Sequence, residues 1–314
     1  MLSWFFNRLF YSIVTIIGVL TLTFIVMRVI PGNPVLIYLG DMATPEAVEQ
    51  MTARLGLDQP LYIQYKDFLL NLFLHGDFGT SIHLGRPVLN EILYHLPYTI
   101  HLMIASFIVS ISIGIPVGMI AAFYKESAFD HIMRPLSLIG LAIPSFWLGL
   151  MLILLFSLRL EWFPVLGAGT AGNPASIIYH IILPSLTIGV TMGAMNMRVA
   201  RSCLLEVMNT QYITMAYAKG LKKVYFLCNY LLKNALIPVV TIVGLQLGRL
   251  ISISVIVEIV FNRPGLGKLL VDSIFLRDYP MALGVIVFSS VFIVFINVIV
   301  DIIYFVVDPR IRVD

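Results

Sequence analysis

The stretch YTIHLMIASFIVSISIGIPVGMIAAF (Tyr98–Phe123) decides the fold, because it runs for 26 residues without a Lys, Arg, Asp or Glu. A helix that crosses the bilayer core of about 30 Å needs about 20 apolar residues. The stretch is long enough to span a membrane, and we expect it to be a transmembrane helix. Pro116 lies inside it and is expected to kink the helix, because proline removes a backbone hydrogen bond.

Five other stretches have the same character, so the sequence predicts an all-α integral membrane protein with about six transmembrane helices. They cover residues of about 9–28, 134–158, 180–200, 236–258 and 282–306. Pro184 is expected in the first turn of the 180–200 helix, where proline is tolerated. Glycine pairs four residues apart, Gly114 with Gly118 and Gly189 with Gly193, let another helix approach closely. Such pairs serve in static packing and in helices that slide during gating.

The composition excludes a soluble fold and gives no support for a nucleic-acid partner. Hydrophobic residues make up 59% of the 314 residues and charged residues 12%, about half the usual share of a soluble domain. The formal net charge of +3 is too weak to indicate nucleic acid, whereas a lipid bilayer needs no polar exterior. The two cysteines, Cys203 and Cys228, form no disulfide framework. The apolar run Leu9–Met27 is too long for a signal peptide and lacks a cleavage site, so we expect a retained first helix.

The basic residues indicate the orientation in the membrane. With the N-terminus in the cytosol, eleven Lys and Arg fall in cytosolic segments of roughly 66 residues, and seven fall in external segments of roughly 114 residues. This density favours cytosolic N- and C-termini. The predicted organisation is a first transmembrane helix with an external segment over residues 1–97. A core of five transmembrane helices follows over residues 98–314, with a cytosolic loop at 201–235.

The most informative segment lies in that loop and reads NTQYITMAYAKGLKKVYFLCNYLLKNALIP (Asn209–Pro238). Residues 212–219 favour a helix that is too short to span a membrane. Asn209 or Thr210 can cap its start, and Gly220 ends it. The segment therefore predicts a short cytosolic helix, a glycine break and a basic patch.

This short helix has two physical interpretations. Its alanines keep it thin, and Tyr212, Met215 and Tyr217 offer apolar anchors, which suits a groove in a partner protein. The alternative is a surface helix on the lipid headgroups, with Lys222 and Lys223 reaching the phosphates. The residues alone leave both open.

The loop resembles the cytoplasmic "EAA" loop of ABC importer permeases, whose short coupling helix sits in a cleft of the ATPase subunit. Thr214, Met215 and Ala216 stand at the E-A-A positions and Gly220 at the glycine, so Thr and Met depart from the consensus. TMAYAKGL followed by LLKNALIPVVTIVGLQLG is similar to the B-type permeases of dipeptide, oligopeptide and nickel importers. Further motifs extend the resemblance over nearly the whole chain: MRVIPGNP (Met27–Pro34, with Asn33 where Asp is usual), LGLDQPLYIQY (Leu55–Tyr65), GDFGTS (Gly76–Ser81), FNRPGLGKLLVDSIFLRDYP (Phe261–Pro280) and VDPRIR (Val307–Arg312).

The resemblance implies a type I ABC importer permease that forms half of a translocation pore. It implies four kinds of neighbour: a second, C-type permease subunit, two ATP-binding cassette ATPases, an external substrate-binding protein, and the lipid of a bacterial or archaeal plasma (inner) membrane. ATP and Mg would bind to the ATPases, because this chain lacks a G-x-x-x-x-G-K-[ST] loop: Leu269 follows Lys268 where Ser or Thr is required. We expect no catalytic residue, metal site or cofactor in this chain.

The resemblance also carries over a set of ATPase-coupling residues and a substrate class. The coupling residues are Tyr212, Thr214, Met215, Ala216, Tyr217, Ala218, Lys219 and Gly220. The implied substrates are dipeptides or oligopeptides. Nickel or a metal chelate is the alternative, and glutathione-like peptides remain open. A secondary transporter would need paired repeats, and the sequence shows no clear internal repeat.

Polar residues inside the predicted spans are candidates for the transport path, because charge in a bilayer is costly and usually functional. Asn196, Gln246 and Arg249 are these candidates. Our hypothesis is that Arg249 faces the pore and attracts a substrate carboxylate. The alternative is that it pairs with an acidic group of the partner permease. Arg28 and Glu258 lie near the outer ends of their spans, where we expect them to reach water and to have structural roles.

Overall fold

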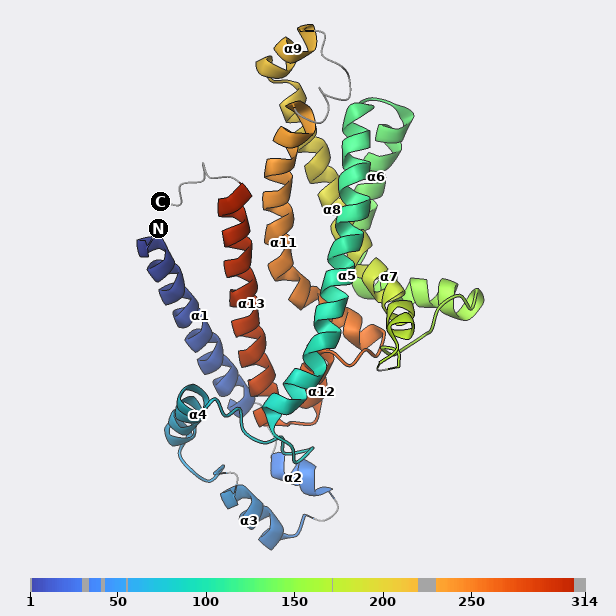
Figure 1. Cartoon of the computed structure of the whole chain (residues 1–314). Coiled ribbons are helices and arrows are strands. Elements are labelled where there is room, and N and C mark those ends of the chain that lie inside the picture. The colour runs from blue at the N-terminus through green and yellow to red at the C-terminus, as the bar shows by residue number, and fades with distance from the viewer. Residues whose placement is uncertain are drawn as a thin grey trace. The chain divides into compact units, whose positions relative to one another are not determined.

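The computed structural model describes residues 2–29, 34–40, 43–54, 56–170, 172–219 and 230–307. Within these ranges the chain is helical and has no strand, only an isolated bridge between Thr80 and Pro87, so the predicted all-α class is confirmed. The helices, shown in Figure 1, are α1 (Leu2–Val29), α2 (Pro34–Leu39), α3 (Pro45–Arg54), α4 (Leu61–His75), α5 (Val88–Phe123), α6 (Ala128–Ala142), α7 (Ser145–Leu152), the π-helical η2 (Ile153–Arg159), α8 (Pro174–Met208), α9 (Gln211–Ala218), α11 (Lys233–Val260), α12 (Leu266–Phe275) and α13 (Tyr279–Val307).

Helices that can cross a membrane match the predicted spans in most cases. In the described part of the chain, α1, α5, α8 and α13 are each long and apolar enough to cross alone. Two bent pairs bring the number to as many as six: α6 with α7 and η2, and the two halves of the segment Tyr230–Val260, which meet at 44°.

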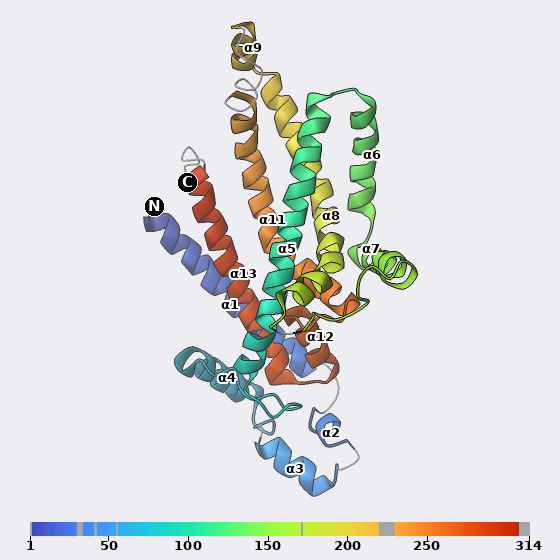
Figure 2. The same cartoon turned by 45° about the vertical axis from the view of Figure 1, so that its right-hand side comes forward.

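The predicted span over 134–158 is present as two helices and not as one continuous helix. The chain bends by 103° between α6 and α7, as Figure 2 shows, because Pro144 stands between the two helices and biases the preceding residue away from helical geometry. The 15 residues of α6 measure about 22 Å, less than the bilayer core. This segment is therefore a broken span or a re-entrant loop.

The helix that contains Pro184 is longer than predicted, and the expectation for that proline is wrong. α8 begins at Pro174, ten residues before Pro184. Asn173 precedes the helix, and its side chain accepts a hydrogen bond from the Ser176 amide. The first-turn position thus belongs to Pro174, and Pro184 lies inside the helix. α5 also starts earlier than predicted and continues as a helix through Pro116.

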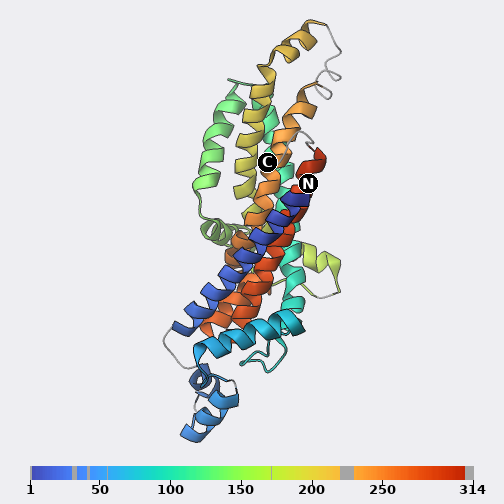
Figure 3. The ribbon, with the colours of Figure 1, turned by 90° about the vertical axis from the view of Figure 1, so that its left-hand side faces the viewer.

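The chain divides into two compact units, each with its own core. The first comprises residues 1–97 and 265–294, and the second comprises 98–264 and 295–314, so α5 and α13 contribute to both. In the first unit, α1 runs beside α13 (Figure 3), and Leu20 of α1 packs with Leu72 of α4 and Val287 of α13. Residues from α5, α12 and α13 form a further cluster there: Val88, Ile92, Leu266, Leu269, Met281 and Val285.

The second unit is built around α8, which packs against α6, α7 and α11. Its contact with α5 depends on the predicted glycines. A Cβ at Gly114 would lie 2.4 Å from the Gly193 carbonyl oxygen, and one at Gly189 would lie 2.4 Å from Val109 Cγ1. No side chain fits at these distances, so the glycine pairs form a tight packing face between the two helices.

Candidate coupling helix and polar path

The short helix predicted over residues 212–219 is present as α9, within one residue of its expected bounds. α8 ends at Met208, and the amide of Asn209 donates to the carbonyls of Leu205 and Glu206 at 3.2 Å each. Thr210 Oγ1 donates to the Val207 carbonyl at 2.6 Å, and α9 starts at the next residue. Asn209 therefore closes α8, and α9 follows at once beyond the end of that helix (Figure 1).

α9 has one buried face and one exposed face. Ile213 and Ala216, three residues apart, are both buried. Ile213 packs in a cluster with Ala122 of α5, Leu204 of α8, Leu231 just before α11 and Ala235 in its first turn. Through this cluster Ile213 connects α9 to three long helices of its unit.

The exposed face carries apolar side chains that this chain does not cover. Met215 is 65% exposed and Tyr212 is 43% exposed, and Ala218 and Lys219 are exposed as well. Ala216 faces inward and positions the helix. The side chains of Thr214 and Tyr217, and Gly220 with the lysines after it, lie outside the described residues. An uncovered methionine and tyrosine on a short helix favour a protein partner, because such residues are typical interface anchors.

Sequence reasoning missed a buried ion pair between α6 and α8. The Asp130 side chain is fully buried, and Arg201 of α8 donates to it from Nε (2.7 Å) and from Nη2 (2.9 Å) in a fork. Arg134 of α6 donates to the same carboxylate. Arg201 lies seven residues before the end of α8, so the fork joins α6 to the helix that leads into α9. The sequence did offer one signal for this ion pair. Asp130 lies next to an apolar stretch and one helical turn before Arg134.

A second buried carboxylate, Asp278, lies in the unit formed by residues 1–97 and 265–294. Ser81 Oγ donates to it, as do the amides of Ile82 and His83 at 3.2 Å and of Met281 at 3.3 Å. Three of these donors come from the loop between α4 and α5. Asp278 thus ties that loop to the start of α13.

Asn196 and Gln246 come together inside the second unit. Gln246 Nε2 of α11 donates to Asn196 Oδ1 of α8 at 2.8 Å, and Asn196 Nδ2 donates to Ser110 Oγ of α5 at 3.4 Å. Both amides are buried, Asn196 fully and Gln246 with 8% exposed. The two bonds together join α5, α8 and α11 and leave the two amides little exposed surface.

Arg249, the third candidate, is apart from these two. It is exposed on α11, whereas Gly248 beside it faces α13, where a Cβ would lie 2.8 Å from Asn297 Oδ1. Among the three predicted path residues, Arg249 is thus the one that a substrate or a partner chain can reach.

The expectation that Glu258 reaches water is wrong. Glu258 is fully buried, and Thr99 Oγ1 of α5 donates to its Oε1 at 2.7 Å. Arg263, five residues later, is fully buried as well, with its guanidinium carbon 5.9 Å from the centre of the Tyr98 ring. Burial lowers the pKa of Arg263. The expected structural role of Glu258 agrees with its bond to α5, and the Arg28 side chain lies outside the described residues.

Comparison with known families decides the class of this chain. The family described as binding-protein-dependent transport system inner membrane component matches residues 114–313, and its N-terminal part matches residues 1–113. This chain belongs to that family. Its members are multi-pass inner-membrane permease subunits of ABC importers, which work with ATPase and binding-protein partners.

The similarity to named relatives covers nearly the whole length of this chain. It is 42% identical to the oligopeptide transport system permease protein AppB of Bacillus subtilis, over 99% of this chain and 100% of the relative. It is 37% identical to the dipeptide transport system permease protein DppB of Escherichia coli K12, over 99% of each. A solved chain of the inward-facing MetNI methionine ABC transporter has a TM-score of 0.57 at 19% identity, covering 69% of this chain and 96% of that one. That likeness supports the fold.

Proposed function

We propose that this chain is the permease subunit of an ATP-driven importer of dipeptides or oligopeptides, in which it forms half of the pore. The observation that carries the substrate class is its full-length similarity to permeases named for oligopeptide and dipeptide transport. The other half of the pore would come from a second, C-type permease subunit. An external binding protein would deliver the peptide.

The chain takes no part in the chemistry of ATP hydrolysis in this proposal. Two partner ATPases bind ATP and Mg, and α9 transmits their motion to the transmembrane helices. The exposed Met215 and Tyr212 support this role, since both are available to a partner, and so does Ile213, which connects α9 to α5, α8 and α11. The termini and the loop at 201–235 would then lie in the cytosol, in line with the distribution of Lys and Arg.

Arg249 is the residue we propose for contact with the substrate. It is exposed in the middle of α11, and a guanidinium at the middle of a membrane span is costly unless water or an anion meets it. A peptide carboxylate in the pore would supply that anion. An acidic group of the partner permease is the alternative, and Asn196 and Gln246 would then position the helices beside it.

Uptake by cells tests the proposal directly. A strain without this gene should lose uptake of radiolabelled dialanine or tetra-alanine and keep uptake of nickel, and the gene on a plasmid should restore the loss. Loss of nickel uptake with intact peptide uptake would instead favour the metal importer. Peptide uptake that persists after removal of the partner ATPase would favour a secondary transporter.

A matched pair of variants tests α9. Met215→Glu places a charge on the exposed face and should lower peptide uptake at least tenfold, because an unpaired charge at an interface core is strongly unfavourable. The chain should remain in the membrane at its normal level. Tyr124→Glu is the control: Tyr124 is also 65% exposed, and it lies in a segment that is expected to be cytosolic. Equal losses in the two variants would contradict a specific role for α9.

A further inference from the structure

α4 (Leu61–His75) is a largely apolar helix that is too short to cross a membrane, and it packs against one that is long enough. Its 15 residues measure about 22 Å, less than the bilayer core. α1, in contrast, contains a candidate span over Phe10–Met27. Both helices belong to the unit formed by residues 1–97 and 265–294, and α4 lies at the end of α1 that is remote from the N-terminus, as Figure 1 and Figure 3 show.

The contacts between the two helices place α4 at the depth of the hydrocarbon core. The ring of Tyr65 lies 5.1 Å from the ring of Phe24, and Leu72 packs with Leu20. Leu20 lies seven residues before Met27, where the candidate span ends, and these residues correspond to about 10 Å of helix. Leu72 therefore contacts α1 well inside a core of about 30 Å. The second half of α4 lies deeper than the first, because Leu20 lies deeper than Phe24.

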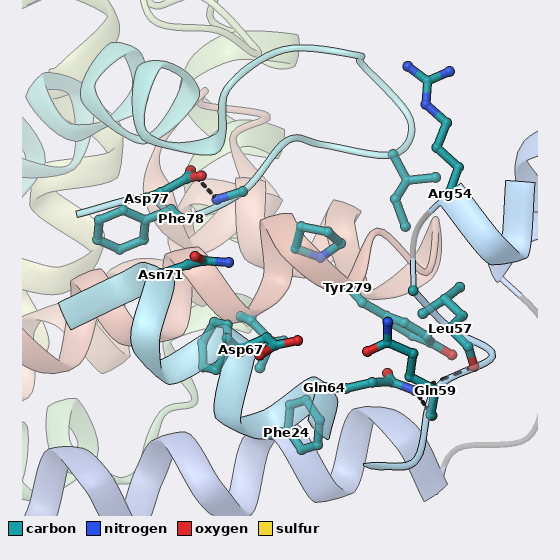
Figure 4. A pocket seen from close by; sticks show the side chains of 16 residues that line it. Phe24, Arg54, Leu57, Gln59, Gln64, Asp67, Asn71, Asp77, Phe78 and Tyr279 are labelled. Atoms are coloured by element: carbon teal, nitrogen blue, oxygen red, sulfur yellow. Dashed lines mark hydrogen bonds between the residues drawn. The ribbon is translucent and has the colours of Figure 1, made fainter. Parts of the chain in front are cut away.

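α4 separates its polar side chains from its apolar ones. Gln64, Asp67 and Asn71 are spaced by three and four residues and share one face of the helix, where they line a cavity of about 390 Å³ (Figure 4). Another face carries exposed apolar side chains: Tyr62 is 73% exposed, Leu70 is 42%, Phe73 is 60% and Leu74 is 71%. A helix with one polar stripe and a wide apolar surface is typical of the membrane interface.

The surroundings of this apolar face favour lipid as its occupant. At the same level of α1, Leu22, Ile25 and Val26 are exposed, and at that depth of a membrane span such side chains meet acyl chains. The one charged residue among the exposed apolar side chains of α4 is Lys66, four residues from Tyr62 and from Leu70. A lysine can lay its apolar stem along such a face and extend its ammonium group to the headgroups. Lys66 lies in the first half of α4, which is the shallower half.

We propose that α4 is embedded in the leaflet at the Met27 end of α1, which is the outer leaflet in the predicted orientation. Tyr62, Leu70, Phe73 and Leu74 contact lipid acyl chains, and Lys66 contacts a lipid phosphate. The inference rests on membership in a family of multi-pass permeases and is independent of the substrate. It assigns part of the expected external segment to the membrane, where α4 anchors the cavity beside it to the bilayer.

Spin labelling of the assembled transporter in nanodiscs tests this placement. Phe73→Cys and Asn71→Cys are made separately after replacement of Cys203 and Cys228 by serine, and each new cysteine receives a nitroxide. Electron paramagnetic resonance then measures collisions with O2, which concentrates in the hydrocarbon core, and with a water-soluble nickel chelate. The ratio of O2 to nickel collisions should be several-fold higher for Phe73→Cys than for Asn71→Cys, because the two positions lie on different faces of α4.

Three further variants calibrate the measurement. Leu22→Cys on the exposed side of α1 gives the ratio of a lipid-facing position, and Glu49→Cys, exposed on α3, gives that of a position in water. Leu70→Cys repeats the measurement on the apolar face of α4, so that the result does not depend on one variant. The ratios for Phe73→Cys and Leu70→Cys should be close to that of Leu22→Cys.

Three results would overturn the proposal. Ratios for Phe73→Cys and Leu70→Cys equal to that of Glu49→Cys would place the apolar face of α4 in water. Few collisions with either reagent would show that a protein, such as the second permease, covers this face. A loss of O2 collisions on addition of the substrate-binding protein would assign the face to that partner.

Discussion

Asp130 and Asp278 are both buried carboxylates, one in each compact unit, and different chemistry holds them. Asp130 is bound by the guanidinium groups of Arg201 and Arg134, so a negative charge meets positive charges from two helices. Asp278 is bound by a serine hydroxyl and three backbone amides, all without net charge. The first arrangement depends on three side chains. The second depends mainly on the path of the backbone, so that few substitutions other than at Asp278 can remove its donors.

The largest effect is expected from Asp130→Ala. Removing the carboxylate leaves Arg201, whose side chain is only 18% exposed, without its fork partner, and an unpaired charge in such a site is strongly unfavourable. We expect a loss of roughly 3 kcal/mol in the free energy of unfolding. Thermal unfolding of the purified transporter in nanodiscs checks this. A melting temperature equal to wild type would show that the fork contributes little.

Asp278→Asn should have the next largest effect. Asparagine keeps one acceptor oxygen, so about half of the four donors lose their partner and face an NH2 group instead. The expected cost is roughly 2 kcal/mol, because most of the donors that bind Asp278 are buried. The same unfolding measurement applies, with Asp272→Asn, a half-exposed residue of α12, as control. A loss of unfolding free energy larger than that of Asp130→Ala would contradict the expected order. It would mean that the bonds to Asp278 stabilise the fold more than the ion pairs of Asp130 do.

Arg201→Lys sharpens the ionic half of the comparison. Lysine keeps the positive charge and loses the two parallel hydrogen bonds of the fork, so the loss should be roughly 1 kcal/mol, smaller than for removal of the carboxylate. In the background of Asp130→Ala the same substitution should have little effect. Equal effects in both backgrounds would mean that Arg201 acts on stability without Asp130.

Glu126→Gln is expected to have the smallest effect. Glu126 pairs with Arg134 at 3.0 Å, but it is exposed, and solvent screens the pair. The hydrogen bond from Arg134 lowers the pKa of Glu126 below its ordinary value of 4.5. Any stabilisation is therefore present above pH 4.5 and is lost as the pH falls through the lowered pKa. Melting curves from pH 7 down to pH 3 should show variant and wild type converging at the acid end.

Much of the fold was predictable, because the length of an apolar run is a local property of the sequence. The spans at α1, α5, α8 and α13 and the short helix α9 follow from such runs and from the polar residues between them. The 103° bend at Pro144 was missed, since an apolar run looks the same in a straight span and in a broken one. Proline permits either outcome, and tertiary packing decides between them.

The polar contacts were less predictable, because their partners are far apart in the chain. Asn196 and Gln246 were identified as polar residues in spans, but their bond to each other joins positions 50 residues apart. Asp130 and Arg201 are 71 residues apart, and nothing local links them. Glu258 was expected to reach water, and it is buried because Thr99 offers it a hydroxyl. Sequence indicates which residues are polar, whereas helix packing decides which polar groups meet.

The attachment of α9 through Ile213 has a mechanical consequence. A force applied to the exposed Met215 side of α9 would pass into the chain through the cluster that Ile213 forms with Ala122, Leu204, Leu231 and Ala235. The load would be shared among α5, α8 and α11. A small displacement of α9 would therefore reach all three helices at once.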